Sequence, residues 1–144
     1  MGHRMKVKGL STEIVLDERA ITRVVFDSDT PNDSNARATD YGLSVQIYGK
    51  MLFDLKAAAT DPTIELAKWS QIPSYNEDCY RNFEVDVISA SQIVRNYKLP
   101  QAFVVAYTED LDDETGVGTF YLHVKQKKDE NTQVKIGGGF AADE

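Results

Sequence analysis

The sequence predicts a mainly β protein, an antiparallel barrel or sandwich with one short α-helix. Several segments alternate apolar and polar residues with the two-residue period of a β-strand, and only one segment has helical spacing. Strands and helices do not alternate along the chain as they do when a sheet is parallel. With 144 residues, 42% of them hydrophobic, the chain is long enough to form a single domain around one core.

The first third of the chain is predicted to contain several strands. Residues Met5–Asp17 alternate as two strand segments with a kink at Gly9, and Asp17–Arg19 is short enough to form a tight hairpin. The next strand is expected at Ala20–Phe26, where β-branched and aromatic residues gather. A further strand is expected at Leu43–Lys50. The N-terminus contains no apolar signal core, and we expect residues 1–4 to be a remnant of cloning, with Met5 as the native start.

Residues Asp27–Asp40 form a polar segment without a single large apolar side chain, so they cannot contribute to a core. Long loops inside compact domains are usually functional. Three interpretations stay open: a mobile surface loop, an arm that orders against a neighbouring subunit, and a calcium loop. The calcium ligands would be Asp27, Asp29 and Asp33, but their spacing lacks the glycine and the terminal glutamate of an EF-hand.

One segment, Pro62–Trp69, is predicted to be helical. Asp61 is suited to cap the helix and Pro62 to occupy its first turn, while Pro73 follows its end. Trp69 is predicted to fill the core against the sheet, and stacking on a ligand is the alternative role for this side chain.

The second half of the chain is predicted to be β-structure. Alternation along Tyr80–Leu99 slips near Ile88–Ala90, which indicates a bulge, a bend, or two strands joined by a short turn. Pro100 is expected to interrupt strand pairing. The stretch Ala102–Lys128 is predicted to be a long hairpin with an acidic, glycine-containing connector. Its first block is almost entirely apolar and is expected to be buried on both faces, whereas its second block alternates and has one wet face.

After this hairpin, Asp129–Asn131 is expected to turn the chain into a last strand that contains Val134 and Ile136. Three glycines then begin a tail, residues 137–144, which we expect to be flexible. The whole chain is interpreted as one domain.

Charge and cysteine content argue against several classes of function. A net charge of −7 and a pI near 4.8 make nucleic-acid binding an unlikely role, because phosphate recognition needs clustered lysine and arginine. No run approaches the roughly 20 apolar residues that span a bilayer, so we expect no membrane insertion. The single cysteine excludes an intrachain disulfide, and we expect the protein to be made in the cytoplasm and to leave it, if at all, without a cleaved signal.

The sequence contains no recognisable catalytic constellation. His3 lies in the first residues, His123 lies on the polar side of a predicted strand, and the usual zinc, serine-hydrolase and nucleotide motifs are missing. A hydrolase that uses Cys79 with His123 is the weaker alternative, because nothing in the sequence brings the two together. We therefore predict that the protein is not an enzyme and carries no cofactor.

Three stretches resemble a known family. They are the sequence V-V-F-D-S-D-T-P-N-D-S-N-A-R at Val24–Arg37, the passage Trp69–Arg81, and the passage Arg95–Asp129. In them the chain resembles the small tube proteins of contractile injection systems and phage tails, such as the haemolysin-coregulated protein (Hcp) of type VI secretion. Similar proteins of Gram-positive bacteria sometimes carry the label "membrane-associated protease", for which this chain offers no nucleophile, base or metal set.

The resemblance implies a small β-barrel with a flanking helix that forms homo-oligomeric, hexameric rings stacked into a hollow tube for effectors. It also implies spike, baseplate and sheath proteins as partners, and export as part of the tube. Contacts between subunits are implied for strand edges and for the polar arm, and the candidate interface residues are Asp29, Pro31, Asn32, Asp33, Asn35 and Arg37. The alternative is a monomeric β-barrel that binds a small ligand or calcium.

Overall fold

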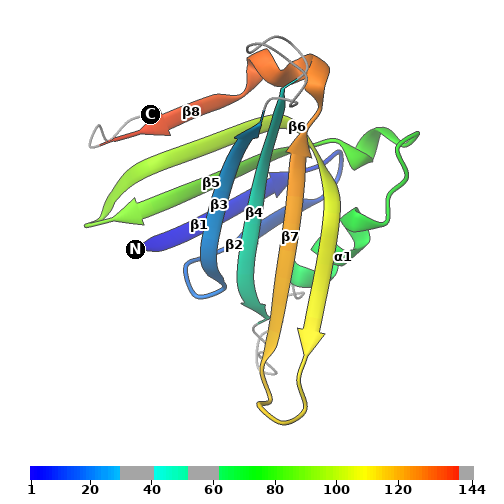
Figure 1. The fold of residues 1–144 in the computed structure, drawn as a ribbon. Helices are drawn as coiled ribbons and strands as arrows, with labels where there is room; N and C mark the ends of the chain where they lie inside the picture. The colour runs from blue at the N-terminus through cyan, green and yellow to red at the C-terminus, as the bar shows by residue number, and fades with distance from the viewer. Residues whose placement is uncertain (30–40, 52–61, 140–144) are drawn as a thin grey trace.

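A computed structural model describes residues 1–29, 41–51 and 62–139 of the chain (Figure 1). In these ranges, eight strands form one antiparallel sheet, accompanied by a single α-helix and two 3-10 turns. The predicted fold class is confirmed. The elements are β1 (Gly2–Lys8), β2 (Glu13–Leu16), β3 (Ile21–Asp29), β4 (Gly42–Met51), α1 (Pro62–Ser70), η1 (Glu77–Cys79), β5 (Arg81–Ser89), β6 (Gln92–Leu111), β7 (Gly118–Gln126), η2 (Lys128–Gln133) and β8 (Lys135–Gly138).

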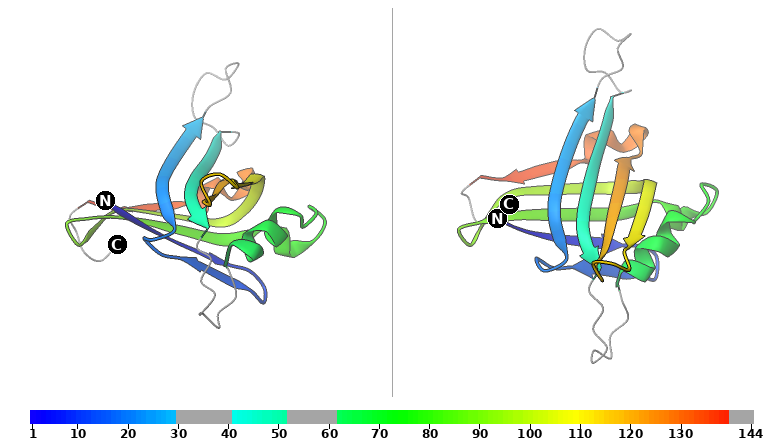
Figure 2. Two further views of the ribbon diagram at one scale, coloured as in Figure 1. Left: turned by 90° about the horizontal axis from the view of Figure 1, so that it is seen from below. Right: turned by 60° about the horizontal axis from the view of Figure 1, so that its bottom comes forward.

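The sheet has the strand order β2-β1-β5-β6-β7-β4-β3, and β8 also pairs with β6. The long strand β6 belongs to two parts of this sheet, because its first half pairs with β5 and β8 and its second half pairs with β7. Figure 2 shows the strands of these two parts crossing one another. We call β2-β1-β5-β6-β8 the first layer and β6-β7-β4-β3 the second layer. The core lies between them.

The core follows the alternation that the sequence predicts. Apolar side chains of both layers point inward, and α1 adds Leu66 and Trp69. Burial of this apolar surface is the main stabilising contribution to the fold. The inward-facing strand residues with 0–1% exposure include Met5, Val7, Val45, Ile47, Phe83, Val85, Leu99, Leu122 and Val124.

Two expectations about the N-terminal strands were wrong. The two strand segments on either side of Gly9 are present, but a turn joins them instead of a kink, because the Gly9 N–H donates to the carbonyl of Thr12 at 2.8 Å and closes a hairpin between β1 and β2. The turn from Asp17 to Ala20 is present, with an N–H to carbonyl distance of 3.1 Å, but it does not join paired strands. Since β2 and β3 lie at opposite ends of the strand order, this turn carries the chain from one layer to the other.

The first residues and the polar segment both contribute to strands. Gly2, His3 and Arg4 begin β1 and pair with β5. The residues Asp27–Asp29, expected to belong to a loop, instead extend β3 and pair with Gly42–Ser44. Pairing between two backbones needs no apolar side chain. A prediction from apolar residues therefore ended this strand at Phe26, whereas the observed strand ends at Asp29. The rest of the segment, residues 30–40, lies outside the described residues.

The slip in alternation near Ile88 corresponds to a register shift between Val87 and Ile88 followed by a turn, which are two of the three outcomes left open. Ala90 and Ser91 have φ angles of +53° and +63°, as in the two-residue type I′ turns that join antiparallel strands. Pro100 interrupts the pairing of β6 with β5, as expected, but β6 itself continues through it. The register shifts between the Phe83–Leu99 and Arg81–Ala102 pairs, so Pro100 falls in a bulge, where its missing N–H removes no ladder hydrogen bond.

The predicted hairpin of β6 and β7 is confirmed, and its strands are joined by residues 112–117. On β7, Phe120, Leu122 and Val124 are buried, as the alternation predicts. The block that begins at Ala102 is not buried on both faces, because Val105 is 45% exposed at a second register shift. Its apolar composition therefore misled the prediction.

The last strand is shorter and lies later than expected. Val134 precedes β8, and Gly137 and Gly138, expected to begin a flexible tail, pair with Asn96 and Arg95. A Cβ atom at Gly138 would lie 2.5 Å from the carbonyl oxygen of Val94, so only glycine permits this close approach. Among the described residues, no helix combines the length and the apolar character that crossing a membrane requires.

Candidate assembly surfaces

The second layer has two borders with no strand partner among the described residues. Strand β3 pairs only with β4, and β6 beyond Ala102 pairs only with β7. The β3 border is nine residues long. Because exposed strand edges carry backbone groups that can pair with another chain, both borders are candidate contacts between copies of this protein.

The outward side of the second layer presents a row of polar and aromatic side chains, which we call the polar face: Arg23, Gln46, Tyr48, Thr108, Tyr121 and His123. Strand register places these residues side by side across four strands. The Arg23 guanidinium lies 5.2 Å from the centre of the Tyr48 ring, and this ring lies 4.9 Å from that of Tyr121.

Hydrogen bonds continue along the polar face. The Tyr48 hydroxyl donates to Oε1 of Gln46 at 3.2 Å, and Nε2 of Gln46 donates to Oδ2 of Asp27 at 3.1 Å. These contacts hold the side chains in fixed positions, although the side chains lie on the outer surface and are not part of the core. Sequence analysis missed this network because it depends on the register of three strands.

His123 lies on this face, as predicted. Its Nε2 atom is buried and has no hydrogen-bond partner among the described residues. Burial lowers the pKa of His123, the Lys125 charge lowers it further, and Asp27 acts in the opposite direction. The neutral form of the His123 imidazole is therefore favoured over the protonated form.

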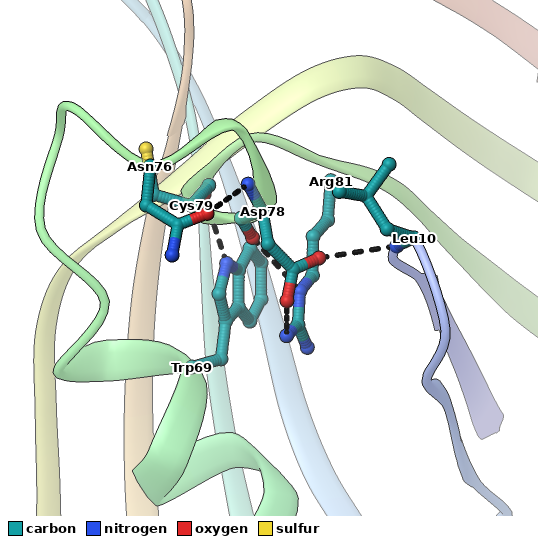
Figure 3. Close-up of polar contacts among 6 residues, drawn as sticks. All are labelled: Leu10, Trp69, Asn76, Asp78, Cys79 and Arg81. Carbon is teal, nitrogen blue, oxygen red and sulfur yellow. Dashed lines mark hydrogen bonds and ion pairs between the residues drawn. The ribbon is translucent and has the colours of Figure 1, made fainter.

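Cys79 lies in a different environment, the turn η1 beside α1 (Figure 3). Its thiol is near the carbonyl of Ser74, at 3.9 Å, and no contact among the described residues joins it to His123. Burial raises the pKa of the Cys79 thiol. Since the thiolate is the nucleophile, this environment does not favour the hydrolase alternative.

Trp69 fills the core, as predicted. Its side chain is 1% exposed and its Nε1–H donates to the carbonyl of Cys79 at 2.9 Å. The Arg81 guanidinium lies 5.5 Å from the centre of the indole ring. The indole is therefore enclosed by protein groups, and the structure gives no support to the ligand-stacking role.

Only some of the residues predicted to bind calcium or to contact a neighbouring subunit lie within the described ranges. Asp27 accepts the hydrogen bond from Gln46, and Asp29 is exposed at the end of β3. In the described ranges, no group of three or more acidic, histidine or cysteine side chains could hold a metal ion. The calcium candidate Asp33 and the interface candidates Pro31, Asn32, Asn35 and Arg37 lie outside these ranges.

Comparison with solved structures assigns the chain to the Hcp-like fold. Hcp1 from Flavobacterium johnsoniae matches with a TM-score of 0.52 and 17% identity, over 94% of this chain and 96% of that one. Hcp1 from E. coli EAEC 042 matches with a TM-score of 0.56 and 10% identity, over 96% and 99%. A chain of the six-fold symmetrised baseplate of the anti-feeding prophage matches with a TM-score of 0.54 and 14% identity, over 95% and 93%.

No family model and no curated sequence matches this chain. The structural matches nevertheless extend over nearly the whole of each protein. The Hcp-like fold that the sequence resemblance implied is thus confirmed, in the form of two crossing strand layers with a flanking helix.

Proposed function

We propose that this protein is a structural subunit that self-assembles into rings, most simply hexamers, which stack into the hollow tube of a contractile injection or phage-tail-like system. The observation that carries this proposal is the end-to-end match with two Hcp1 proteins and with a chain of a six-fold symmetrised baseplate. The function is therefore self-association and enclosure of a channel rather than catalysis.

The borders of the second layer offer a physical route to ring closure. A contact between β3 of one copy and the second half of β6 in the next joins two different surfaces, so it is a head-to-tail contact. Such contacts close into a ring when the rotation between copies permits it. Closure would continue the layer from copy to copy and provide partners for both strand edges.

The polar face is then suited to line the channel. It is ordered by contacts such as the Arg23–Tyr48 stack, and it would present hydroxyl, amide and imidazole groups rather than an apolar surface to passing effectors. Spike, baseplate and sheath proteins are the proposed further partners. We also propose that assembly takes place in the cytoplasm and that the protein is exported as part of the tube, without a signal peptide.

The polar arm is proposed to contact a neighbouring subunit through Asp29, Pro31, Asn32, Asp33, Asn35 and Arg37. Deleting residues Asn32–Ala38 should leave a folded monomer but abolish tubes. Intact tubes formed by this deletion variant would contradict the role of the arm without contradicting self-assembly through strand edges.

Light scattering coupled to size-exclusion chromatography tests the proposal as a whole. The expected mass is several times that of the 16.1 kDa chain, and near six times it for a hexamer. A strictly monomeric mass at every concentration, together with a calcium-dependent rise in melting temperature, would instead support the monomeric calcium-binding alternative.

A further inference from the structure

A basic groove of about 510 Å³ lies on the outward side of the first layer. Its lysines lie on different strands that are neighbours in the sheet. In the strand register, Lys6 of β1 and Lys98 of β6 lie opposite Glu84 of β5, and Lys135 of β8 lies opposite Lys98. Lys8 lies further along β1 and completes the set. The groove therefore gathers four lysines in a protein whose net charge is −7.

The groove carries an excess of positive charge, because four lysines but only two carboxylates line it. Two glutamates, Glu84 and Glu130, also line the groove, and among the described residues one ion pair forms there, between Lys98 and Glu84 at 3.6 Å. The other three lysines make no ion pair among the described residues. All four side chains are exposed, and the part-buried Pro100 lines the same groove as their aliphatic stems. The groove thus combines positive charge with apolar surface.

The tip of the β6–β7 hairpin has the opposite character. Residues 108–117 are exposed without interruption and include five carboxylates, at positions 109, 110, 112, 113 and 114. No lysine or arginine occurs between Lys98 and Lys125, and none of the five carboxylates forms an ion pair within the described ranges. The tip also exposes two large apolar side chains, Leu111 at 63% and Val117 at 46%.

The tip cannot reach the groove of its own chain. Lys98 and Leu111 lie on the same strand, and pairing of β6 with β7 continues out to Leu111 and Gly118, so the hairpin is held extended. Figure 1 accordingly shows the hairpin tip and β8 at opposite ends of the molecule. A partner for the tip must therefore come from another molecule.

We propose that the acidic hairpin tip of one copy docks into the basic groove of the next copy. The inference rests on the proposed self-assembly and adds a second pair of contacting surfaces to the strand borders. Carboxylates of the tip meet lysines of the groove, and Leu111 and Val117 pack against Pro100 and the lysine stems. Because tip and groove are different surfaces, the contact is head-to-tail and extends the assembly from subunit to subunit.

A charge exchange tests this docking. The groove variant is Lys6→Glu with Lys135→Glu, and the tip variant is Asp110→Lys with Asp113→Lys. Asp112 stays unchanged because its Oδ1 accepts the N–H of Glu114 at 2.9 Å and holds the turn. Sedimentation velocity at about 0.1 M salt, where charges closer than about 10 Å are incompletely screened, gives the association constant.

Each variant alone places like charges together and should weaken self-association by about tenfold or more. The chain that carries all four substitutions restores opposite charges and should recover most of the wild-type association. The matched control, Lys68→Glu with Arg19→Glu, changes the net charge as much as the groove variant does, but at residues that do not line the groove, and should associate like the wild type.

Disulfide cross-linking provides the second readout. Protein with Asp113→Cys mixed with protein with Lys6→Cys should give a cross-linked dimer, whereas Asp113→Cys mixed with Lys68→Cys should not. If the wild type assembles but the charge variants assemble equally well and no cross-link forms, the docking is wrong and the proposed function stands. A wild type that stays monomeric and yields no cross-link overturns both.

Discussion

The guanidinium of Arg81 lies 5.5 Å from the centre of the Trp69 ring while its Nη2 atom pairs with Oδ2 of Asp78 at 2.7 Å (Figure 3). The other carboxylate oxygen of Asp78 accepts the N–H of Leu10 at 3.1 Å. Through these contacts one ion pair connects α1, η1, β5 and the turn between β1 and β2. A Cβ atom at Gly9 would lie 2.7 Å from Oδ1 of Asp78, so the glycine makes room for this connection.

Removing the carboxylate of this pair should destabilise the fold strongly. In Asp78→Asn the Arg81 charge, on a side chain only 4% exposed, loses its partner, and breaking such a pair costs about 3 kcal/mol. Chemical denaturation followed by circular dichroism measures the loss. The control is Asp17→Asn, because the Asp17–Arg19 pair is exposed and should contribute less than about 1 kcal/mol. Equal losses in the two variants would show that burial does not strengthen the pair.

Much of the fold could be predicted because alternation is visible in the residues themselves. Val45 and Ile47, or Leu122 and Val124, are separated by polar residues and are all buried. The order of the strands was harder to predict. A turn such as the one at Asp17 can join two paired strands or carry the chain to another layer, and its local sequence does not distinguish the two. Pro100 shows the same limit, since a bulge accommodates it without ending the strand.

The candidate surfaces were predicted less completely than the fold. The acidic hairpin connector was visible in the sequence, but the basic groove was not, because Lys6, Lys98 and Lys135 are far apart in the chain and meet only through strand register. The polar face likewise depends on the pairing of four strands. Asp78 and Arg81 are close in the sequence, so their proximity could be expected. The burial of their ion pair could not, because it depends on the position of Trp69.

The pH dependence of stability should reveal the part-buried imidazole of His123. Burial lowers the pKa of His123 below its ordinary value near 6.5, so the unfolded chain binds a proton more readily than the folded one. The free energy of unfolding should therefore fall as the pH drops through 6.5 toward the folded pKa, and stay unaffected by this group above pH 7. His123→Gln, which stays neutral, should show a smaller decrease.

His3 provides the necessary comparison, because burial lowers the pKa of His3 as well. Denaturation curves between pH 7.5 and 5 for His3→Gln, His123→Gln and the double variant separate the two contributions. A double variant that retains the full wild-type decrease would contradict the assignment of this pH dependence to the histidines.

The turn between β5 and β6 can be improved. Ala90 and Ser91 both have positive φ angles, which glycine and asparagine tolerate better than alanine and serine. Replacing the pair by Asn-Gly, as Ala90→Asn with Ser91→Gly, should stabilise the fold by about 1 kcal/mol. Thermal unfolding measures the gain, and a lower melting temperature would contradict the assigned turn.

Gly49 should tolerate no side chain. A Cβ atom there would collide with the carbonyl oxygen of Ala20 and with the ring of Phe120, both inside the protein. Gly49→Ala should therefore destabilise the fold by about 2 kcal/mol. At Gly42, on the same strand, the nearest atom is 4.0 Å away, so Gly42→Ala serves as the control and should cost far less in the same denaturation assay.

Electron microscopy of the purified wild-type protein at high concentration tests the central claim, self-assembly into rings, most directly. The account predicts end-on views of closed rings with a central pore, and side views in which rings stack into tubes. Images that contain only single particles of the 16.1 kDa chain at every concentration would contradict it.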